Sequence, residues 1–268
     1  MATALSQITR NWTNPYKSQM TLQGSGGILN GHYASTTGAS GVYQVFGYID
    51  PNADAVVPGG PGVPVGLILN WRSIQQGGEP DPSWNYVSGI GGQLICNEAG
   101  QTVINVNHAL IASNPLPGYV SEAGFFVDRI LYDATQTQND SDQTTAMEAF
   151  PERYPLQGGL IYADTQNPTT KLILLEKPHS AGFWAGFEWN GISTALMGTC
   201  NTGYSQSIGP YQSIAFCGAI LPGLALSLSG WLDHRDNTIT LQRYVVGPQI
   251  WDSRYFQAQG STLTMQQH

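Results

Sequence analysis

Apolar and polar residues alternate along most of this chain, in short runs that Gly, Pro, Asn or Asp interrupt. A period of two is typical of a strand with one buried face. The clearest runs are "GVYQVFGYID" (41–50), "VPVGLILNWRS" (63–73), "GQLICN" (92–97) and "QTVINVNHALIA" (101–112), with "NEAG" as a hairpin turn between the last two. A helical period is not sustained anywhere, and "TTAMEAF" (144–150) predicts at most one short helical turn.

Strands of this length and spacing predict an antiparallel sheet that closes into an up-and-down barrel, whose interior is the natural place for a ligand. The rhythm breaks at "TQTQNDSDQTTAMEAFPERYPLQ" (135–157), a polar stretch that ends in prolines. Such a stretch favours a linker. We therefore predict an all-β chain with one barrel over 1–135, a linker over 136–157 and a second, more divergent barrel over 158–268.

A weak internal repeat supports the tandem arrangement. The stretch "GGQLICNEAGQTVINVNHALI" (91–111) has a counterpart in "SGWLDHRDNTITLQRYVV" (229–246), since each has small residues, a strand, a polar turn and a strand. In the same way "EAGFFVDRILYD" (122–133) corresponds to "PQIWDSRYFQAQ" (248–259). The two halves are therefore expected to share one architecture.

Composition and charge narrow the function classes. Charged residues make up 10% of the chain, beside 32 Gly and 16 Pro, which is typical of a turn-rich β protein. The net charge is −8 and the ten Lys and Arg are scattered, so nucleic acid is not an expected partner. No apolar run is long enough to cross a membrane, and "MATALSQITRNW" does not have the pattern of a signal peptide. We expect a soluble protein, cytoplasmic or secreted.

The cysteines and histidines give little sign of a metal site. Three cysteines cannot form a disulfide framework, although Cys200 and Cys217 could pair if their strands are neighbours. Buried free thiols are the favoured interpretation for these two and for Cys96. The five histidines lack metal-ligand spacing, and we predict no metal and no cofactor.

Several short motifs in the first half, taken together, resemble the avidin and streptavidin family. In order and with similar spacing these are "RNWTNPYKSQMTL" (10–22), "GGILNGHYASTTGASGVYQVFGYID" (26–50), "VGLILNWRS" (65–73) and "VSGIGGQLICNEAGQTVINVNHAL" (87–110). They contain a W-x-N-x-x-x-S start, a G-x-Y-x-S segment, an N-W that closes a central strand, and a G-Q before a hairpin. The resemblance covers about residues 8–135 and implies an eight-stranded barrel that holds a ligand in its open end.

The resemblance also implies a polar end for the pocket. In avidins an Asn, a Ser and a Tyr bind the ureido oxygen of biotin, and these positions are matched by Asn14, Ser18 and Tyr33. Three preorganised donors in a dry cavity stabilise a polarised carbonyl. Other matched positions are Asp133 and Ser35 as acceptors for ureido N–H groups, Ser88 near the sulfur, Trp71 and Leu110 on the wall, and Thr37 and Gly38 in the closing loop.

The apolar end departs from the family pattern. Two tryptophans that avidins place around the ligand correspond to Ile90 and His108. Each lost aromatic wall weakens biotin binding by about 1–3 kcal/mol. A further family tryptophan, which reaches a neighbouring barrel, corresponds to Phe125 in the first half and to Trp251 in the second. We therefore expect the two barrels to pack as an intrachain pseudo-dimer, with Trp251 over the first calyx and Phe125 approaching the second.

The second half keeps the sheet more clearly than the site. Its start, "GLIYADTQNPTTKLILL" (159–175), has no clean W-x-N-x-x-x-S pattern. The position of the family Tyr falls near Glu188 or Trp189, that of the Asp at Gln259, and that of His108 at Tyr244. The second barrel is either a structural partner or holds a different ligand.

Three functions remain open at this stage. The first is a non-catalytic small-molecule binder, with biotin or a cyclic urea as the first ligand to test. The second is a carbohydrate-binding or defence protein, in which loops such as "GGEPDPSWNY" (77–86) and "NTGYSQSIGPYQ" (201–212) stack on sugars. The third is an enzyme that uses the enclosed cavity, for example with His108 and Asp133 as an acid/base pair. The chain is expected to be a monomer or a homodimer.

Overall fold

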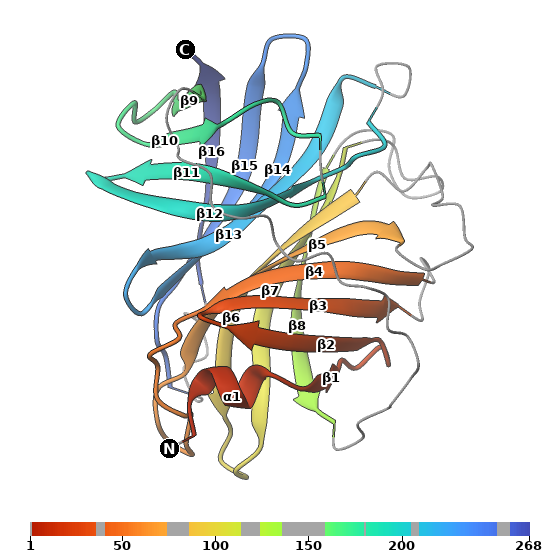
Figure 1. Ribbon diagram of the computed structural model, residues 1–268, viewed down its shortest axis with the longest axis vertical. Coiled ribbons are helices and arrows are strands. Elements are labelled where there is room, and N and C mark those ends of the chain that lie inside the picture. The colour runs from red at the N-terminus through yellow and green to blue at the C-terminus, as the bar shows by residue number, and fades with distance from the viewer. Residues whose placement is uncertain are drawn as a thin grey trace.

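The chain folds into two closed antiparallel barrels of eight strands each, one after the other in the sequence (Figure 1). The computed structural model describes residues 2–35, 41–73, 86–113, 124–135, 159–179, 181–204, 209–250 and 258–268. In each barrel the strands pair in up-and-down order. The fold class predicted from the alternating pattern is confirmed.

The first barrel opens with a short helix that the alternating pattern did not predict, α1 (Ala4–Ile8), capped by Thr3. Its strands are β1 (Asn11–Thr13), β2 (Gln19–Ser25), β3 (Ile28–Ser35), β4 (Gly41–Ile49), β5 (Val63–Ser73), β6 (Tyr86–Cys96), β7 (Thr102–Ala112) and β8 (Gly124–Ala134). β1 pairs with both β2 and β8, which closes the barrel. The predicted hairpin at 97–100 joins β6 to β7.

The second barrel repeats this order. Its strands are β9 (Leu160–Asp164), β10 (Lys171–Leu174), β11 (Phe183–Trp189), β12 (Ile192–Cys200), β13 (Tyr211–Leu221), β14 (Leu224–Asp233), β15 (Thr238–Val246) and β16 (Gln259–Gln267). β9 pairs with β10 and β16 and closes the barrel. The strand that corresponds to β8 is β16, so the sequence match of 122–133 to 248–259 was displaced by about one strand length.

Each barrel has its own apolar interior, built from the inward-facing residues of the alternating strands. Trp12, Met20, Leu67 and Tyr132 are among the buried residues of the first. The interior of the second contains large side chains from all around the sheet: Tyr162, Leu172, Phe187, Leu196, Ile214, Phe216, Leu228, Leu241 and Met265.

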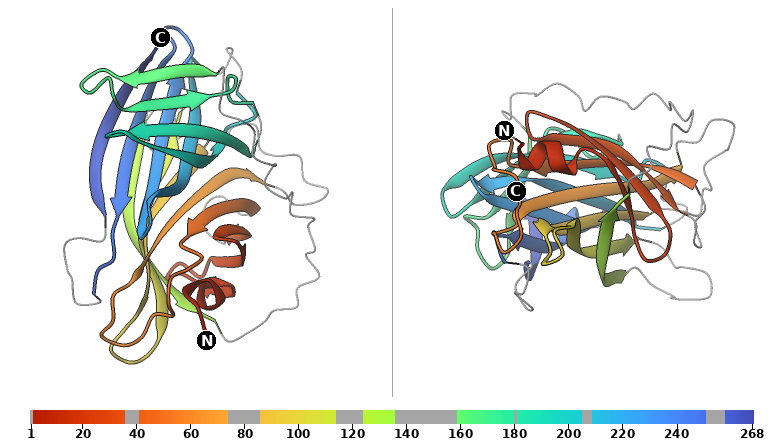
Figure 2. Two further views of the ribbon diagram at one scale, coloured as in Figure 1. Left: turned by 60° about the vertical axis from the view of Figure 1, so that its left-hand side comes forward. Right: turned by 90° about the horizontal axis from the view of Figure 1, so that it is seen from below.

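The outer faces of the two barrels pack against each other, and the views in Figure 2 show the barrels in contact along these sheets. A third apolar cluster lies between them and draws on both barrels: Phe46, Ile68, Val87, Ala109 and Ile111 from the first, and Trp184, Met197, Ala215, Cys217 and Tyr244 from the second. Buried polar contacts join the same faces, such as Asn70 Nδ2 to the carbonyl oxygen of Cys200 at 2.8 Å. The predicted intrachain pseudo-dimer is confirmed.

Small residues let the two sheets approach closely. A Cβ added at Gly89 would lie 2.6 Å from Cβ of Ser229, and one at Gly91 would lie 3.0 Å from Cβ of Tyr244. A Cβ at Gly66 would lie 2.8 Å from the carbonyl oxygen of Leu226. These three glycines form the close-contact strip of the interface, where a larger residue forces the barrels apart.

Phe125 reaches the second barrel, but its place differs from the predicted one. Its ring lies 4.5 Å from the ring of Trp231 on β14. The inward-facing residues of β14 include Leu228 and Leu232, so Trp231 points outward by alternation. Phe125 therefore packs on the outside of the second barrel and not in its calyx.

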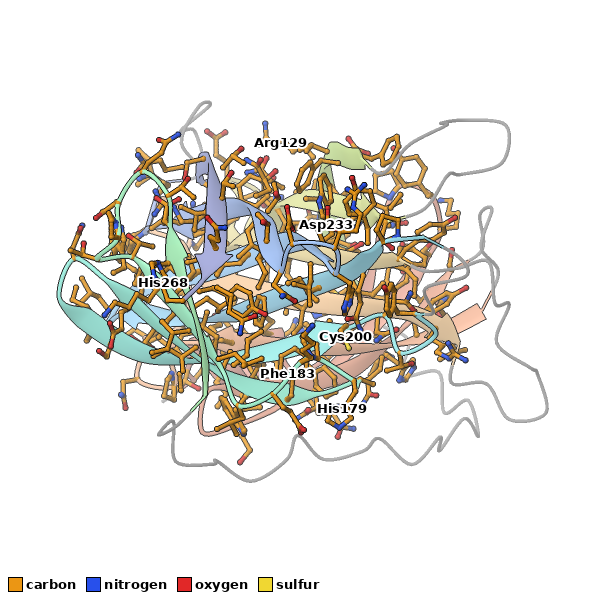
Figure 3. The ribbon with its side chains drawn as sticks, turned by 90° about the horizontal axis from the view of Figure 1, so that it is seen from above. Arg129, His179, Phe183, Cys200, Asp233 and His268 are labelled. Atoms are coloured by element: carbon orange, nitrogen blue, oxygen red, sulfur yellow. The ribbon has the colours of Figure 1, made fainter. Side chains whose placement is uncertain are left out.

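The three cysteines are free and buried, which confirms the favoured interpretation over a Cys200–Cys217 disulfide. Figure 3 shows Cys200 in the interior and Arg129 at the edge of the molecule. Burial raises the pKa of Cys200 to about 12, so its thiol stays protonated at neutral pH. In the described parts of the chain, no helix has the length and apolar character needed to span a membrane.

Candidate functional site

The open end of the first barrel contains a cavity of about 450 Å³. We call it the calyx. It is lined by Asn14, Tyr16, Tyr33, Ser35, Trp71, Tyr86, His108, Leu110, Asp128 and Ile130. Four of these residues are aromatic, and the polar ones come from β3, β7, β8 and the turn after β1. A cavity of this volume is in the range that holds small organic ligands.

The turn after β1 positions Asn14. The side-chain oxygen of Asn14 accepts the backbone N–H groups of Tyr16 at 3.1 Å and Ser18 at 3.0 Å. This local arrangement is typical of Asn, and Lys17 in the same turn has a φ of 68°. Asn14 is 3% exposed, so its side chain is fixed at the floor of the calyx.

The floor presents one hydroxyl to the calyx. Asn14 Nδ2 donates to Tyr33 Oη at 3.1 Å. Tyr132, buried below, also hydrogen-bonds to Asn14 and Tyr33, and with burial as the main cause its pKa is raised far above the usual range. Tyr132 is therefore protonated at neutral pH. Tyr33 Oη accepts from Asn14, and since Tyr33 lines the cavity, its own proton can be donated to a ligand.

A hydrogen-bonded chain fixes one wall. Trp71 Nε1 donates to Ser88 Oγ at 2.7 Å, and Ser88 Oγ lies 2.7 Å from His108 Nε2. Trp71 donates to Ser88, and the direction of the contact between Ser88 and His108 follows the tautomer of His108. A serine beside a histidine is also the start of a nucleophilic site, but Ser88 is 0% exposed and does not line the calyx. The pair therefore orients His108 and presents no nucleophile to a ligand.

His108 is neutral at pH 7. Burial lowers its pKa to about 4 from 6.5, against a smaller opposite effect of Asp128. Between these two values the unfolded chain takes up a proton that the folded chain does not, so the free energy of unfolding falls as pH falls through this window.

We expect wild type to lose about 1–2 kcal/mol more unfolding free energy than His108→Gln when pH is lowered from 7 to about 4.5. Urea denaturation at several pH values measures this difference. His179→Gln is the control, because the side chain of His179 is 67% exposed. Equal pH dependence in wild type and His108→Gln would contradict the expectation.

The carboxylate at the calyx is Asp128, which corrects the prediction for Asp133. Ile130 and Tyr132 face the core of the first barrel, so even-numbered residues of β8 point inward. Asp128 shares this face, whereas Asp133 points outward. Asp133 instead lies beside Arg10, Gln101 and their neighbours near the opposite end of the barrel. A His108–Asp133 acid/base pair is therefore not formed.

The structure brings together about half of the residues predicted for the site. Asn14, Tyr33, Ser35, Trp71, His108 and Leu110 all line the calyx. Ser18, Ser88 and Ile90 are buried around it without lining it, and Ser18 Oγ has no hydrogen-bond partner among the described residues. Thr37, Gly38 and Trp251 lie outside the described residues, so the proposed position of Trp251 over the calyx stays a prediction.

Sequence reasoning missed Tyr16, Tyr86, Asp128, Ile130 and Tyr132. The alternation of "DRILYD" contained the signal for three of them. Asp128, Ile130 and Tyr132 are at every second position of the strand, so they lie on one face, and two of the three are apolar or aromatic. Tyr86 begins β6 two residues before Ser88 and has its parity. Tyr16 had no signal of its own, since it lies in a turn.

The second barrel uses different residues at the corresponding places. Asp164 N donates to Thr170 O at 2.9 Å, as Asn14 N does to Ser18 O at 3.1 Å in the first barrel. Tyr162, Asp164 and Thr170 thus replace the W-x-N-x-x-x-S pattern with two more residues in the turn. This longer turn explains why no clean motif was found.

The inward residue that corresponds to His108 is Arg243 and not Tyr244. Arg243 pairs with Leu228 as His108 pairs with Ile90, and Tyr244 belongs to the interface between the barrels. Arg243 Nε donates to Ser261 Oγ at 2.9 Å, and its guanidinium lies 5.5 Å from the ring of Trp189. Burial lowers the pKa of Arg243, with Asp164 acting in the opposite direction.

Within the described residues, no group of three His, Cys, Asp or Glu side chains could hold a metal ion. The calyx offers aromatic walls, hydroxyl groups such as that of Tyr33, the imidazole of His108 and the carboxylate of Asp128. They can hold a small ring and donate to one polar atom at the floor.

Comparison with solved structures finds proteins whose length is matched almost whole by about half of this chain. A crystal structure of xenavidin is 15% identical, with a TM-score of 0.36, and the match covers 48% of this chain and 96% of that one. An X-ray structure of a biotin-binding protein from chicken is 18% identical, with a TM-score of 0.37, and the match covers 50% and 100%. A structure titled AVR2 is 16% identical, with a TM-score of 0.38 and coverage of 51% and 100%.

No family model and no curated protein matches the chain. The strand order shows the fold by itself: this chain is a tandem of two closed up-and-down barrels of eight antiparallel strands.

Proposed function

We propose that the first barrel is a non-catalytic receptor for a small molecule that places a carbonyl oxygen against Tyr33 at the floor of the calyx. The observation that supports this most directly is the hydroxyl of Tyr33, which receives a hydrogen bond from Asn14 and lines a cavity of about 450 Å³. A hydroxyl fixed in this way is a preorganised donor, and it costs little to orient when a ligand binds.

Biotin or another cyclic urea is the first ligand to test. A ureido oxygen is a strong acceptor, and the ring can pack between Trp71 and Tyr86, which both line the calyx. The calyx lacks the aromatic rings that avidins have at the positions of Ile90 and His108, so we expect affinity far below that of avidins. The rim tyrosines, Tyr16 and Tyr86, supply part of the missing apolar area.

We expect Tyr33→Phe to weaken binding of a cyclic urea about tenfold, because it removes the donor and keeps the ring. Isothermal titration with biotin and with 2-imidazolidinone measures this change. Native mass spectrometry of the same mixtures reports stoichiometry and shows whether the chain is a monomer or a homodimer.

Tyr48→Phe is the matched control. The substitution removes the same kind of hydroxyl group as Tyr33→Phe. Tyr48 lies on β4, and its ring packs against the apolar cluster between the barrels, away from the calyx. Its affinity for the ligand should equal that of wild type. Failure of both compounds to bind at millimolar concentration, or equal affinity in Tyr33→Phe, would overturn the proposal.

A sugar is the second candidate ligand, because the ring of Tyr16 is 54% exposed at the rim of the calyx. Exposed aromatic faces stack on the apolar faces of sugars. The loop 77–86 that suggested this function lies, except for Tyr86, outside the described residues. Binding on a glycan array that Tyr16→Ala abolishes, together with no heat from biotin, would favour this candidate.

A further inference from the structure

Among the described residues that line the calyx, the one formal charge at neutral pH is negative. Among its lining residues only His108 and Asp128 can be charged near pH 7. His108 is neutral there, because burial lowers its pKa to about 4. The carboxylate of Asp128 therefore sets the sign of the potential in the cavity.

The charge of Asp128 is not balanced by a cation in the described part of the chain. Its Oδ2 accepts from Tyr16 Oη at 3.1 Å, and its Oδ1 accepts from the backbone N–H of Arg129 at 2.7 Å. The guanidinium of Arg129 points to the other face of β8, where its Nε donates to Asn105 Oδ1 at 3.1 Å. Figure 3 shows Arg129 at the edge of the molecule. None of the ion pairs found in the described residues involves Asp128.

Aromatic rings surround the space next to this carboxylate. Tyr16, Tyr33, Trp71 and Tyr86 line the calyx together with Asp128. The face of an aromatic ring carries negative potential and attracts an organic cation. Since Asp128 and Tyr16 are exposed while Asn14 and Tyr33 are buried, the charge lies at the rim and the hydroxyl donor at the floor.

We propose that the calyx selects ligands that carry a protonated amine at the rim, beside Asp128 and Tyr16, over ligands of the same shape that carry a carboxylate. The inference rests on the proposed function for the location of the site, and it adds the class of ligand. Biotin itself ends in a carboxylate, so an amine-terminated analogue of biotin binds better than biotin.

The test compares ligands that differ only in charge. Three derivatives of 2-imidazolidinone with one short tail end in an ammonium, a hydroxyl or a carboxylate group, and benzylammonium with benzoate forms a second pair without a urea. Binding is measured by calorimetry and by the NMR shift of the Trp71 indole N–H at low ionic strength. We expect the ammonium ligands to bind about tenfold more tightly than the carboxylates, with the hydroxyl between them.

Asp128→Asn should remove this preference and leave the affinity of the hydroxyl ligand unchanged. Asp133→Asn is the matched control, because it removes an equal charge from the same strand on its outer face, and it should keep the preference. Added salt should reduce the preference in wild type.

The outcomes separate the two proposals. If the ureas bind without regard to charge, or the carboxylates bind more tightly, the ligand class is wrong and the carbonyl receptor stands. If no urea binds but benzylammonium binds in a manner that depends on Asp128, the ligand class stands and the carbonyl receptor fails. If none of the five compounds binds, both are overturned.

Discussion

Trp12→Ala is expected to lower the free energy of unfolding by about 3–5 kcal/mol. Trp12 is 0% exposed in the core of the first barrel, and its Nε1 donates to the carbonyl oxygen of Ile8 at 2.9 Å. The substitution leaves a large cavity at the strand that leads into Asn14, and it removes one of the two donors to the carbonyl oxygen of Ile8, the other being the backbone N–H of Arg10. Urea denaturation followed by circular dichroism measures the loss.

Tyr16→Ala is the control for this substitution. It removes a ring of similar kind four residues further along, but from a position that is 54% exposed. Its unfolding free energy should stay within about 0.5 kcal/mol of wild type. A loss of under 1 kcal/mol in Trp12→Ala would contradict the central packing role of this residue.

Gly89→Val is expected to lower the free energy of unfolding by about 3 kcal/mol and to loosen the contact between the barrels. The new Cβ would lie 2.6 Å from Cβ of Ser229, which belongs to a strand of the other barrel. The clash is with the Cβ of a short side chain in the middle of a strand, and Ser229 cannot move its Cβ away by changing rotamer. The two sheets must therefore separate. Denaturation together with small-angle X-ray scattering measures both effects.

The matched control is Gly260→Val. Gly260 is an exposed strand position of β16, where an added Cβ has neighbours only at 3.5 Å or more. We expect stability close to that of wild type. If Gly89→Val is as stable and as compact as Gly260→Val, the close-contact strip does not hold the barrels together.

The sequence was sufficient to predict the barrels because alternation reports directly which face of a strand is buried. The same alternation limits prediction of the site, since a shift of one residue moves a side chain to the other face. Asp133 was chosen over Asp128, and Tyr244 over Arg243, through shifts of odd numbers of residues. In both cases the parity of the neighbouring apolar residues, such as Ile130 and Leu241, would have given the inward residue.

Other features depend on contacts that strand patterns do not contain. Tyr16 hydrogen-bonds to Asp128, which lies 112 positions further along the sequence. Tyr132, which contacts Tyr33, belongs to β8, the last strand of the first barrel. The role of Ser88 as a link between Trp71 and His108 depends on the register of three strands. Such contacts follow from barrel closure, which is fixed only when the first and last strands meet.

The interface between the barrels has a consequence for dilution. Two separate barrels would form this contact at a rate set by their concentration, and they would part as the solution is diluted. In one chain the contact is intramolecular, with an effective concentration set by the chain itself. The two barrels are thus kept in a fixed one-to-one ratio, so the calyx of the first barrel has the same neighbour however dilute the protein becomes.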